Sequence, residues 1–250
     1  ADALGPDRVK GILMPSKFTS NESNEDADQL GKNLGIGLES ISIEEIVKAY
    51  DITLDPIFKG SEKNITEENI QSRTRGSLLM AYSNKFGHMV LTNGNKSEVS
   101  VGYSTLYGDM CGGFSVVKDL YKSELYKLAE WRNDNIPSAS LLNEKSVIPQ
   151  NIITKEPTAE LKPNQIDKDT LPPYEVLDQI LYLLVEKESS ILEIVDKGFD
   201  FDVVTKVQNM LYNSEYKRRQ AAPGVKISER NFGYDRRYPI TNAFRDGKGS

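Results

Sequence analysis

The sequence predicts an α/β protein: a doubly wound parallel sheet flanked by helices, followed by a helical C-terminal part. Short apolar runs at 9–14, 38–43 and 88–92 alternate with amphipathic stretches, an order typical of parallel strands joined by helical crossovers. The 250 residues, of which 38% are hydrophobic, are enough for one sizeable core. We therefore expect a single domain over residues 1–250, with ligands bound beyond the carboxyl ends of the strands.

The first crossover is predicted from local signals. The apolar run at 9–14 ends at a proline and a polar loop, as a buried strand would. A helix is predicted over about 22–34, because Ser20 or Asn21 can cap its beginning and Gly35 suits its end.

The longest predicted helix begins at Thr66, after a strand at 38–43 and a short helix at 44–50. Its apolar residues recur at helical spacing and are expected to face the core: Ile70, Leu78, Leu79, Tyr82 and Phe86. The last predicted strand, 88–92, follows this helix, and His88 at its start is expected to be packed or half-exposed.

The C-terminal half is predicted to be helical apart from one long loop. An amphipathic helix at 122–132 carries Leu125, Leu128 and Trp131 on its apolar side. The segment 133–172 is proline-rich and has few periodic apolar residues, so we expect a mobile loop within the domain. Three further helices are predicted, at 173–187, 189–197 and 201–212.

Composition and charge disfavour several classes of protein. The formal net charge of −6 argues against nucleic-acid binding, and no apolar run approaches the roughly 20 residues that cross a bilayer. With His88 and Cys111 the only residues of their kinds, neither a zinc cluster nor an internal disulfide fits, and a cytoplasmic location does. The tail at 214–248 is rich in Lys and Arg, and is either a solvated surface or a source of cations for an anionic ligand.

Two runs after the last predicted strand carry the strongest chemical signal. Residues 91–98 and 102–109 place small, polar and acidic side chains where a nucleotide can approach the backbone and Glu98 can face a metal or a polar group. The alternative is a simple turn from strand to helix, capped by Asn95 or Ser97.

A further run, 67–75, lies in the longest predicted helix. Asn69 and Arg73 are four residues apart and share a helical face, where the guanidinium can pair with a phosphate or a carboxylate. The alternative is an exposed helix with local Glu/Arg pairs. By composition alone, the remaining runs are a loop and a basic turn: 155–161, 171–178 and 216–220.

Taken together, these runs resemble the synthetase domain of the glutamine-dependent NAD synthetases. That family belongs to the ATP pyrophosphatases, whose fold is adenine-nucleotide α-hydrolase-like. The similarity extends from Ile12–Ser16 to Arg237–Asn242, and is most specific over 94–109. The resemblance implies ATP-dependent amidation of deamido-NAD to NAD through an adenylated intermediate, with Mg²⁺. It also implies a homodimer or higher homo-oligomer and a glutaminase domain that supplies ammonia from glutamine.

The resemblance also implies site residues. Catalytic roles fall to Glu98 and Lys122, and Glu98 is the implied metal ligand. The implied deamido-NAD-binding residues are Asn69, Arg73, Glu98, Tyr103, Leu106, Asp109 and Lys217. The implied ATP-binding residues are Met14, Asn93, Lys122 and Thr158. Two positions depart from family patterns: Asn93 stands where the family usually has Thr, and Leu106 stands where the ammonia-dependent branch has Lys.

The phosphate-binding loop of the family, Ser-Gly-Gly-x-Asp-Ser, would precede residue 1, and the glutaminase domain has no counterpart in these 250 residues. We therefore expect adenylation by this chain alone to be impaired. An alternative function is a catalytically inactive dimerisation or nucleotide-binding module. A GMP synthetase is disfavoured by the runs at 69–73 and 94–109.

Overall fold

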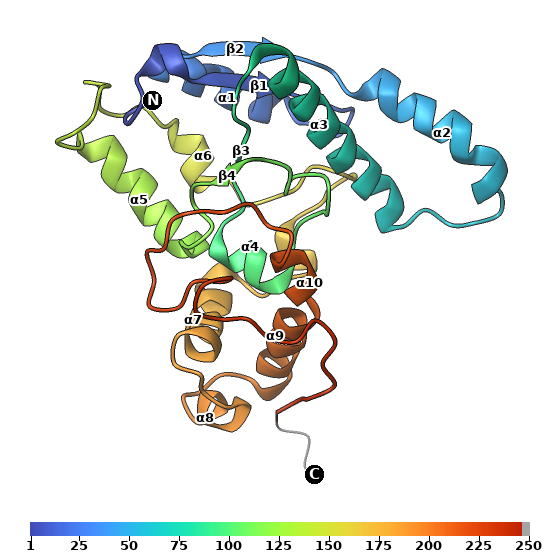
Figure 1. The fold of residues 1–250 in the computed structure, drawn as a ribbon, viewed down its shortest axis with the longest axis vertical. Coiled ribbons are helices and arrows are strands. Elements are labelled where there is room, and N and C mark those ends of the chain that lie inside the picture. The colour runs from blue at the N-terminus through green and yellow to red at the C-terminus, as the bar shows by residue number, and fades with distance from the viewer. Residues whose placement is uncertain (247–250) are drawn as a thin grey trace. The chain divides into compact units, whose positions relative to one another are not determined.

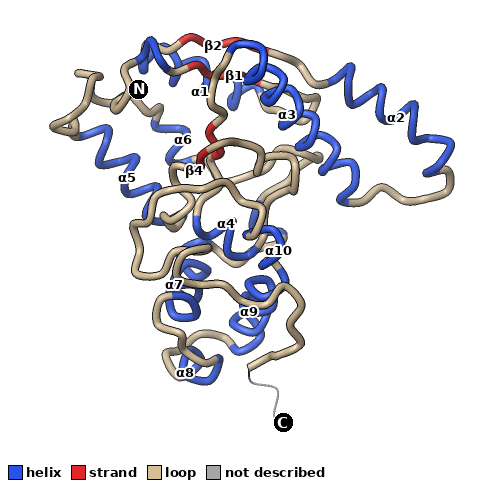
Figure 2. The backbone as a smooth tube through the Cα atoms, viewed as in Figure 1, coloured by secondary structure: helices blue, strands red, loops and turns tan. Residues whose placement is uncertain are grey.

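The computed structural model describes residues 1–246, so Lys248 of the basic tail lies outside the described residues. The described chain forms two compact units. Unit 1 consists of Ala1–Arg75 and Tyr126–Asp169, and unit 2 of Gly76–Leu125 and the described residues from Thr170 onward. Figure 1 shows the course of the chain through both units, and Figure 2 marks their helices and strands. Each unit contains one pair of parallel strands.

Unit 1 contains a βαβ crossover. β1 (Lys10–Leu13) and β2 (Gly37–Ser40) pair in parallel, and α1 (Asn21–Leu34) connects them. The side chain of Ser20 caps the beginning of α1, and Gly35 ends it in the left-handed conformation with a φ of 64°. Both strands, the helix and its caps were predicted from the sequence, and these predictions are confirmed.

The helix α2 (Glu44–Phe58) continues past residue 50, where the sequence predicted its end. Pro56 lies inside its last turn, although proline usually ends a helix. None of its residues is buried. Large apolar side chains of α2 are exposed instead: Ile46, Tyr50, Ile52, Ile57 and Phe58.

The helix α3 (Ile65–Phe86) buries polar residues, so the predicted apolar stripe is wrong as a description of its buried face. Gln71 and Thr74 are each 3% exposed, whereas Phe86 is 58% exposed. The Gln71 amide donates to the Leu161 carbonyl at 2.8 Å, and the Thr74 hydroxyl donates to the Ile70 carbonyl at 2.8 Å. Hydrogen bonding makes burial of the Gln71 amide nitrogen and of the Thr74 hydroxyl inexpensive, whereas the buried Gln71 amide oxygen has no partner among the described residues.

The remainder of unit 1 departs from prediction in two respects. In α5 (Lys122–Asp134), Leu128 and Trp131 of the predicted apolar side are 46% and 47% exposed. The segment 133–172 contains two short helical pieces that were not predicted, α6 (Gln150–Thr154) and η2 (Asp167–Asp169). Elements this short give too few residues for a periodic pattern. Mobility of this segment stays a prediction. A third short piece, η1 (Pro6–Arg8), precedes β1.

The strands of unit 2 are shorter than the sequence suggested. β3 (Leu91–Thr92) pairs in parallel with β4 (Phe114–Ser115), and β4 was not predicted. The expectation that His88 is packed or half-exposed is wrong, because His88 is exposed and Met89 beside it is 70% exposed. The apolar run at 88–92 was therefore a poor guide to burial.

The core of unit 2 is helical. It is formed by α4 (Lys96–Val101), α7 (Tyr174–Val185), α8 (Ile191–Val195) and α9 (Phe201–Asn213), with the short α10 (Glu215–Arg218) after them. Figure 1 shows α7, α8 and α9 gathered below α4. Their fully buried apolar side chains are Leu177, Ile180, Leu181, Val185, Ile191, Ile194, Val204, Val207 and Leu211. Burial of this apolar surface is the main source of stability of unit 2. Within residues 1–246, every helix is too short or too polar to cross a membrane.

Candidate functional site

The first turn of α4 fixes Glu98 at the end of β3. Asn95 caps the helix by accepting from the Glu98 amide at 3.0 Å, and the Glu98 carboxylate accepts from the Asn95 amide at 3.2 Å. This reciprocal pair is a capping box, so the turn predicted as an alternative reading of this run is present. The other oxygen of Glu98 accepts from the Lys122 ammonium at 3.2 Å, and both side chains are 19% exposed. The two residues implied to be catalytic therefore form an ion pair.

Asp178 of α7 positions the backbone of the two helix turns that carry this ion pair. The Ser97 hydroxyl donates to Asp178 at 2.5 Å and accepts from the Lys122 amide at 2.9 Å. The other oxygen of Asp178 accepts from the Ser123 amide at 2.8 Å. Burial raises the pKa of Asp178 above its ordinary value, although these hydrogen bonds oppose the rise. Asp178 thus joins the first turns of α4 and α5 through contacts that no local sequence pattern reveals.

A second wall of the site is the segment 102–109, which also contains Tyr103 and Leu106. The Lys217 ammonium donates to the Gly102 carbonyl at 2.7 Å and to the Ser104 carbonyl at 2.6 Å. Burial lowers the pKa of Lys217. In the same segment, the Asp109 carboxylate accepts from the Thr105 amide at 2.7 Å. Lys217 therefore shapes this wall through the backbone.

The two walls border an open pocket of about 370 Å³, part of it continuous with solvent. Its polar lining includes Thr92, Glu98, Ser104, Asp109 and Lys118, and Ala222 of the C-terminal segment closes it on another side. Of the residues implied by the resemblance, Glu98 and Asp109 line this pocket, with Lys122 bonded to Glu98. Asn93 is exposed and lies next to the pocket residue Gly94 in the chain.

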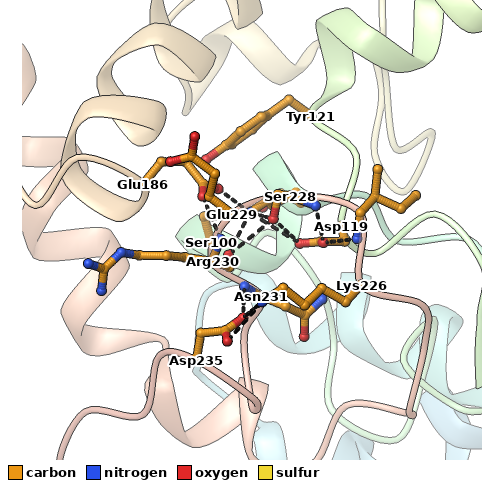
Figure 3. A network of polar contacts seen from close by, with 12 residues as sticks. Ser100, Asp119, Tyr121, Glu186, Lys226, Ser228, Glu229, Arg230, Asn231 and Asp235 are labelled. Atoms are coloured by element: carbon orange, nitrogen blue, oxygen red, sulfur yellow. Dashed lines mark hydrogen bonds and ion pairs between the residues drawn. The ribbon is translucent and has the colours of Figure 1, made fainter.

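A C-terminal strap, residues 221–231, is bound to the loop that follows β4. The Asp119 carboxylate accepts from the amides of Ile227 and Ser228 at 2.7 and 2.8 Å and from the Ser228 hydroxyl at 2.8 Å. Figure 3 shows this carboxylate directed at Ser228. Burial alone would raise the pKa of Asp119, but these hydrogen bonds and the charge of Lys96 lower it below its ordinary value.

Lys96 is the buried centre of this network. Its side chain is fully buried, and its ammonium pairs with Asp119 at 3.1 Å and with Glu186 of α7. It also donates to the Ser228 hydroxyl at 2.5 Å and to the Arg230 carbonyl at 2.8 Å. Neither Lys96 nor Asp119 was singled out from the sequence, because their partners lie far along the chain.

Cations of the basic tail are bound within unit 2. Arg218 is buried against Glu215 at 3.0 Å and donates to the Ser100 carbonyl at 2.7 Å. Burial lowers the pKa of Arg218 to about 10. Arg219 also pairs with Glu215, and Arg230 pairs with Glu188. These arginines therefore stabilise unit 2. The sequence had suggested two other roles for the basic tail, a solvated surface or a source of cations for an anionic ligand.

The remaining implied site residues lie in unit 1. Asn69 and Arg73 stand one turn apart on α3, as predicted from their spacing, with Asn69 half-buried and Arg73 exposed. The Met14 carbonyl accepts from Arg75 at 3.0 Å, and the Thr158 hydroxyl donates to the Gln165 carbonyl at 2.5 Å.

Comparison with known proteins supplies the family. Residues 1–221 match the family model described as NAD synthase. The chain belongs to the NAD synthase family. The resemblance found in the sequence is thereby confirmed.

Relatives of this NAD synthase chain include proteins named glutamine-dependent NAD(+) synthetase. The chain is 54% identical over 245 residues to the one from Thermotoga maritima, covering 98% of the chain and 41% of that protein. It is 49% identical over 243 residues to the one from Synechocystis sp., covering 97% of the chain and 42% of that protein. The chain therefore spans about two fifths of the length of these relatives.

Solved structures agree with the α/β fold. A glutamine-dependent NAD+ synthetase from Acinetobacter baumannii, in complex with ADP, is 45% identical with a TM-score of 0.58, covering 95% of this chain and 41% of that one. A glutamine-dependent NAD(+) synthetase from Cytophaga hutchinsonii is 20% identical with a TM-score of 0.74, covering 94% and 38% of the respective chains. The second likeness concerns the fold alone. The predicted fold class, with parallel strands and flanking helices, is confirmed.

Proposed function

We propose that this NAD synthase chain is the synthetase part of a longer enzyme that amidates deamido-NAD to NAD with ATP, using ammonia released from glutamine. The names of the relatives support the reaction, and the ADP complex of the Acinetobacter baumannii structure supports an adenine nucleotide as ligand. The observation that carries the proposal is the Glu98–Lys122 pair, which is held beside an open pocket by buried contacts. A non-catalytic module would not need a carboxylate and an ammonium fixed in this way.

The proposed reaction has two steps. In the first, a carboxylate oxygen of the nicotinate bonds to the α-phosphorus of ATP, the bond from that phosphorus to the β-phosphate oxygen breaks, and pyrophosphate leaves. In the second, ammonia bonds to the carbonyl carbon, the bond to the AMP oxygen breaks, and the nitrogen loses a proton. Negative charge accumulates in the first step, so the Lys122 ammonium would stabilise its transition state. Glu98 would orient Lys122 and the nicotinate end of the substrate.

Magnesium fits this site as an ion shared between protein and substrate. Among residues 1–246, no group of three or more His, Cys, Asp or Glu side chains could hold a metal. Mg²⁺ is commonly bound through one or two carboxylates together with substrate phosphates, so Glu98 suffices as a protein ligand. When bound, the ion would neutralise charge on the phosphates.

The other implied roles remain part of the proposal. For deamido-NAD we propose Asn69, Arg73, Tyr103, Leu106, Asp109 and Lys217 as contacts. For ATP we propose Met14, Asn93, Lys122 and Thr158. A cytoplasmic location is also proposed, because a reducing compartment suits Cys111, which is unpaired in the described chain.

The test is NAD formation from deamido-NAD, ATP and ammonia by the longer protein, with and without Glu98→Ala. We expect the variant to lose at least about 100-fold in kcat, because a fixed charged group at the reacting atoms contributes on this scale. Glu175→Ala is the matched control, since Glu175 is an exposed carboxylate on α7 and should leave the rate unchanged. Full activity of Glu98→Ala would contradict the assigned role, and absence of NAD formation by the unmodified protein would refute the function.

We also propose that the chain forms a homodimer through α2. Its exposed apolar side chains include Ile52 at 67% and Ile57 at 74% exposure, a pattern that favours a protein partner over water. Light scattering on the chain should give a dimer mass, and Ile57→Glu should give a folded monomer. A monomeric unmodified chain at micromolar concentration would refute this assembly.

A further inference from the structure

Lys118 is a buried lysine whose hydrogen bonds are incomplete. Lys118 is 8% exposed, follows β4 in the chain and lines the pocket. Its ammonium donates to the Ala222 carbonyl at 2.7 Å, the one hydrogen bond that it makes within residues 1–246. Because an ammonium has three donors, two of them have no acceptor in the described chain.

The charges near Lys118 do not compensate for this burial. Asp119 is the next residue, but its carboxylate is engaged by Lys96 and by the strap. Burial lowers the pKa of Lys118 more than Asp119 raises it. A buried ammonium without sufficient partners costs free energy, so its position beside an open pocket points to an acceptor supplied from outside the chain.

The pocket itself narrows the chemistry of that acceptor. Glu98 and Asp109 line it together with Lys118, so the ammonium is the charged donor of the lining. An anionic oxygen placed near Lys118 would use its two remaining donors in charge-assisted hydrogen bonds.

We propose that Lys118 is a ligand-binding residue that receives an anionic oxygen of the nucleotide substrate. This inference rests on the proposed function, which supplies three sources of such an oxygen: the nicotinate carboxylate of deamido-NAD, the diphosphate of deamido-NAD and the phosphates of ATP. If the source is the carboxylate, Lys118 also discriminates substrate from product. Amidation converts that anion into a neutral amide, which weakens its bond to the ammonium and favours release of NAD.

Binding measurements on the longer protein that contains this chain separate these sources. Titration calorimetry gives the affinities of deamido-NAD, NAD and ATP for the unmodified chain and for Lys118→Met. Lys118→Gln removes the charge while leaving a donor for the Ala222 carbonyl, and Lys118→Arg keeps the charge. Lys187→Met is the matched control, because Lys187 is a partly exposed lysine paired with Glu229 at 2.9 Å outside the pocket lining. The melting temperature of each variant reports whether it folds.

We expect Lys118→Met and Lys118→Gln to lower the affinity for one anionic ligand by at least about tenfold, which is the effect of losing a hydrogen bond to a charged group. Loss of deamido-NAD affinity with NAD affinity unchanged identifies the carboxylate, equal loss for deamido-NAD and NAD identifies the diphosphate of the dinucleotide, and loss of ATP affinity identifies a phosphate of ATP. Lys118→Arg should stay within a few-fold of the unmodified chain, which tests the role of charge even if Lys118→Met folds poorly. Unchanged affinities in folded Lys118→Gln would overturn the inference and leave Lys118 as an anchor of the strap. A longer protein, unmodified at Lys118, that binds none of the three nucleotides would overturn the proposed function along with it.

Discussion

Replacing Lys96 by methionine tests whether the strap and the site are held by one buried charge. The side chains of Lys96, Asp119 and Glu186 are at most 2% exposed, so removal of the cation leaves two buried carboxylates. Asp119 keeps three donors from Ile227 and Ser228, whereas Glu186 keeps the Arg230 amide at 2.7 Å on one oxygen and loses Lys96 on the other. The cost should therefore arise mainly at Glu186.

Breaking a buried ion pair by removing one partner costs about 3–5 kcal/mol, which lowers Tm by about 6–20 °C in a protein of this size. Differential scanning calorimetry or urea unfolding of Lys96→Met measures the loss. In Lys96→Met/Glu186→Met the uncompensated carboxylate is also gone, so we expect much of the stability to return. A single variant within about 1 kcal/mol of the unmodified chain, or a double variant no more stable than the single, would refute the reasoning.

Three further predictions follow from contacts in unit 2. Asp178→Ala should lower kcat by moving the Glu98–Lys122 pair, whereas Asp178→Asn, which can hydrogen-bond to the same groups, should retain most of the activity; equal losses would argue against a positioning role. Gly102→Ala should cost about 1–3 kcal/mol in urea unfolding, because Gly102 has a φ of 72° and an added Cβ would lie 2.2 Å from the Ser214 hydroxyl oxygen. The lowered pKa of Asp119 gives stability that is complete above its ordinary value of 3.8 and lost as the pH falls through the folded value, so hydrogen exchange of the strap should rise in acid below about pH 3.8, and Asp119→Asn should remove that dependence.

Elements with local signals were predicted well. Ser20 and Gly35 mark the ends of α1, and the apolar spacing of α7 and α9 matches their fully buried residues. The strand β4 escaped prediction because two residues show no periodicity. The spacing of the apolar residues in α3 and α5 was a poor guide to burial, because helical spacing alone does not show which face of a helix packs against other elements. Gln71 is buried because a carbonyl 90 residues away accepts its hydrogen bond.

The site was predictable only in part, for the same reason. Glu98 was singled out by the run at 91–98, Lys122 was found through a resemblance, and Asn95 was found through its ordinary role as a helix cap. Most partners of Asp178, Lys96 and Lys118 lie 55 to 134 residues away, and no local pattern of residues reveals such contacts.

The span of the Lys96 network sets an order of events during synthesis. Lys96 bonds to Arg230, 134 residues further along the chain. At about 5–20 residues per second, a ribosome needs roughly 7–27 s to extend the chain from one to the other. During that interval the lysine has no strap to bind and stays hydrated, so α4 can adopt its final surroundings only after residue 230 has been made. A nascent chain stalled before residue 227 would therefore keep the wall of this pocket open to proteases and chaperones.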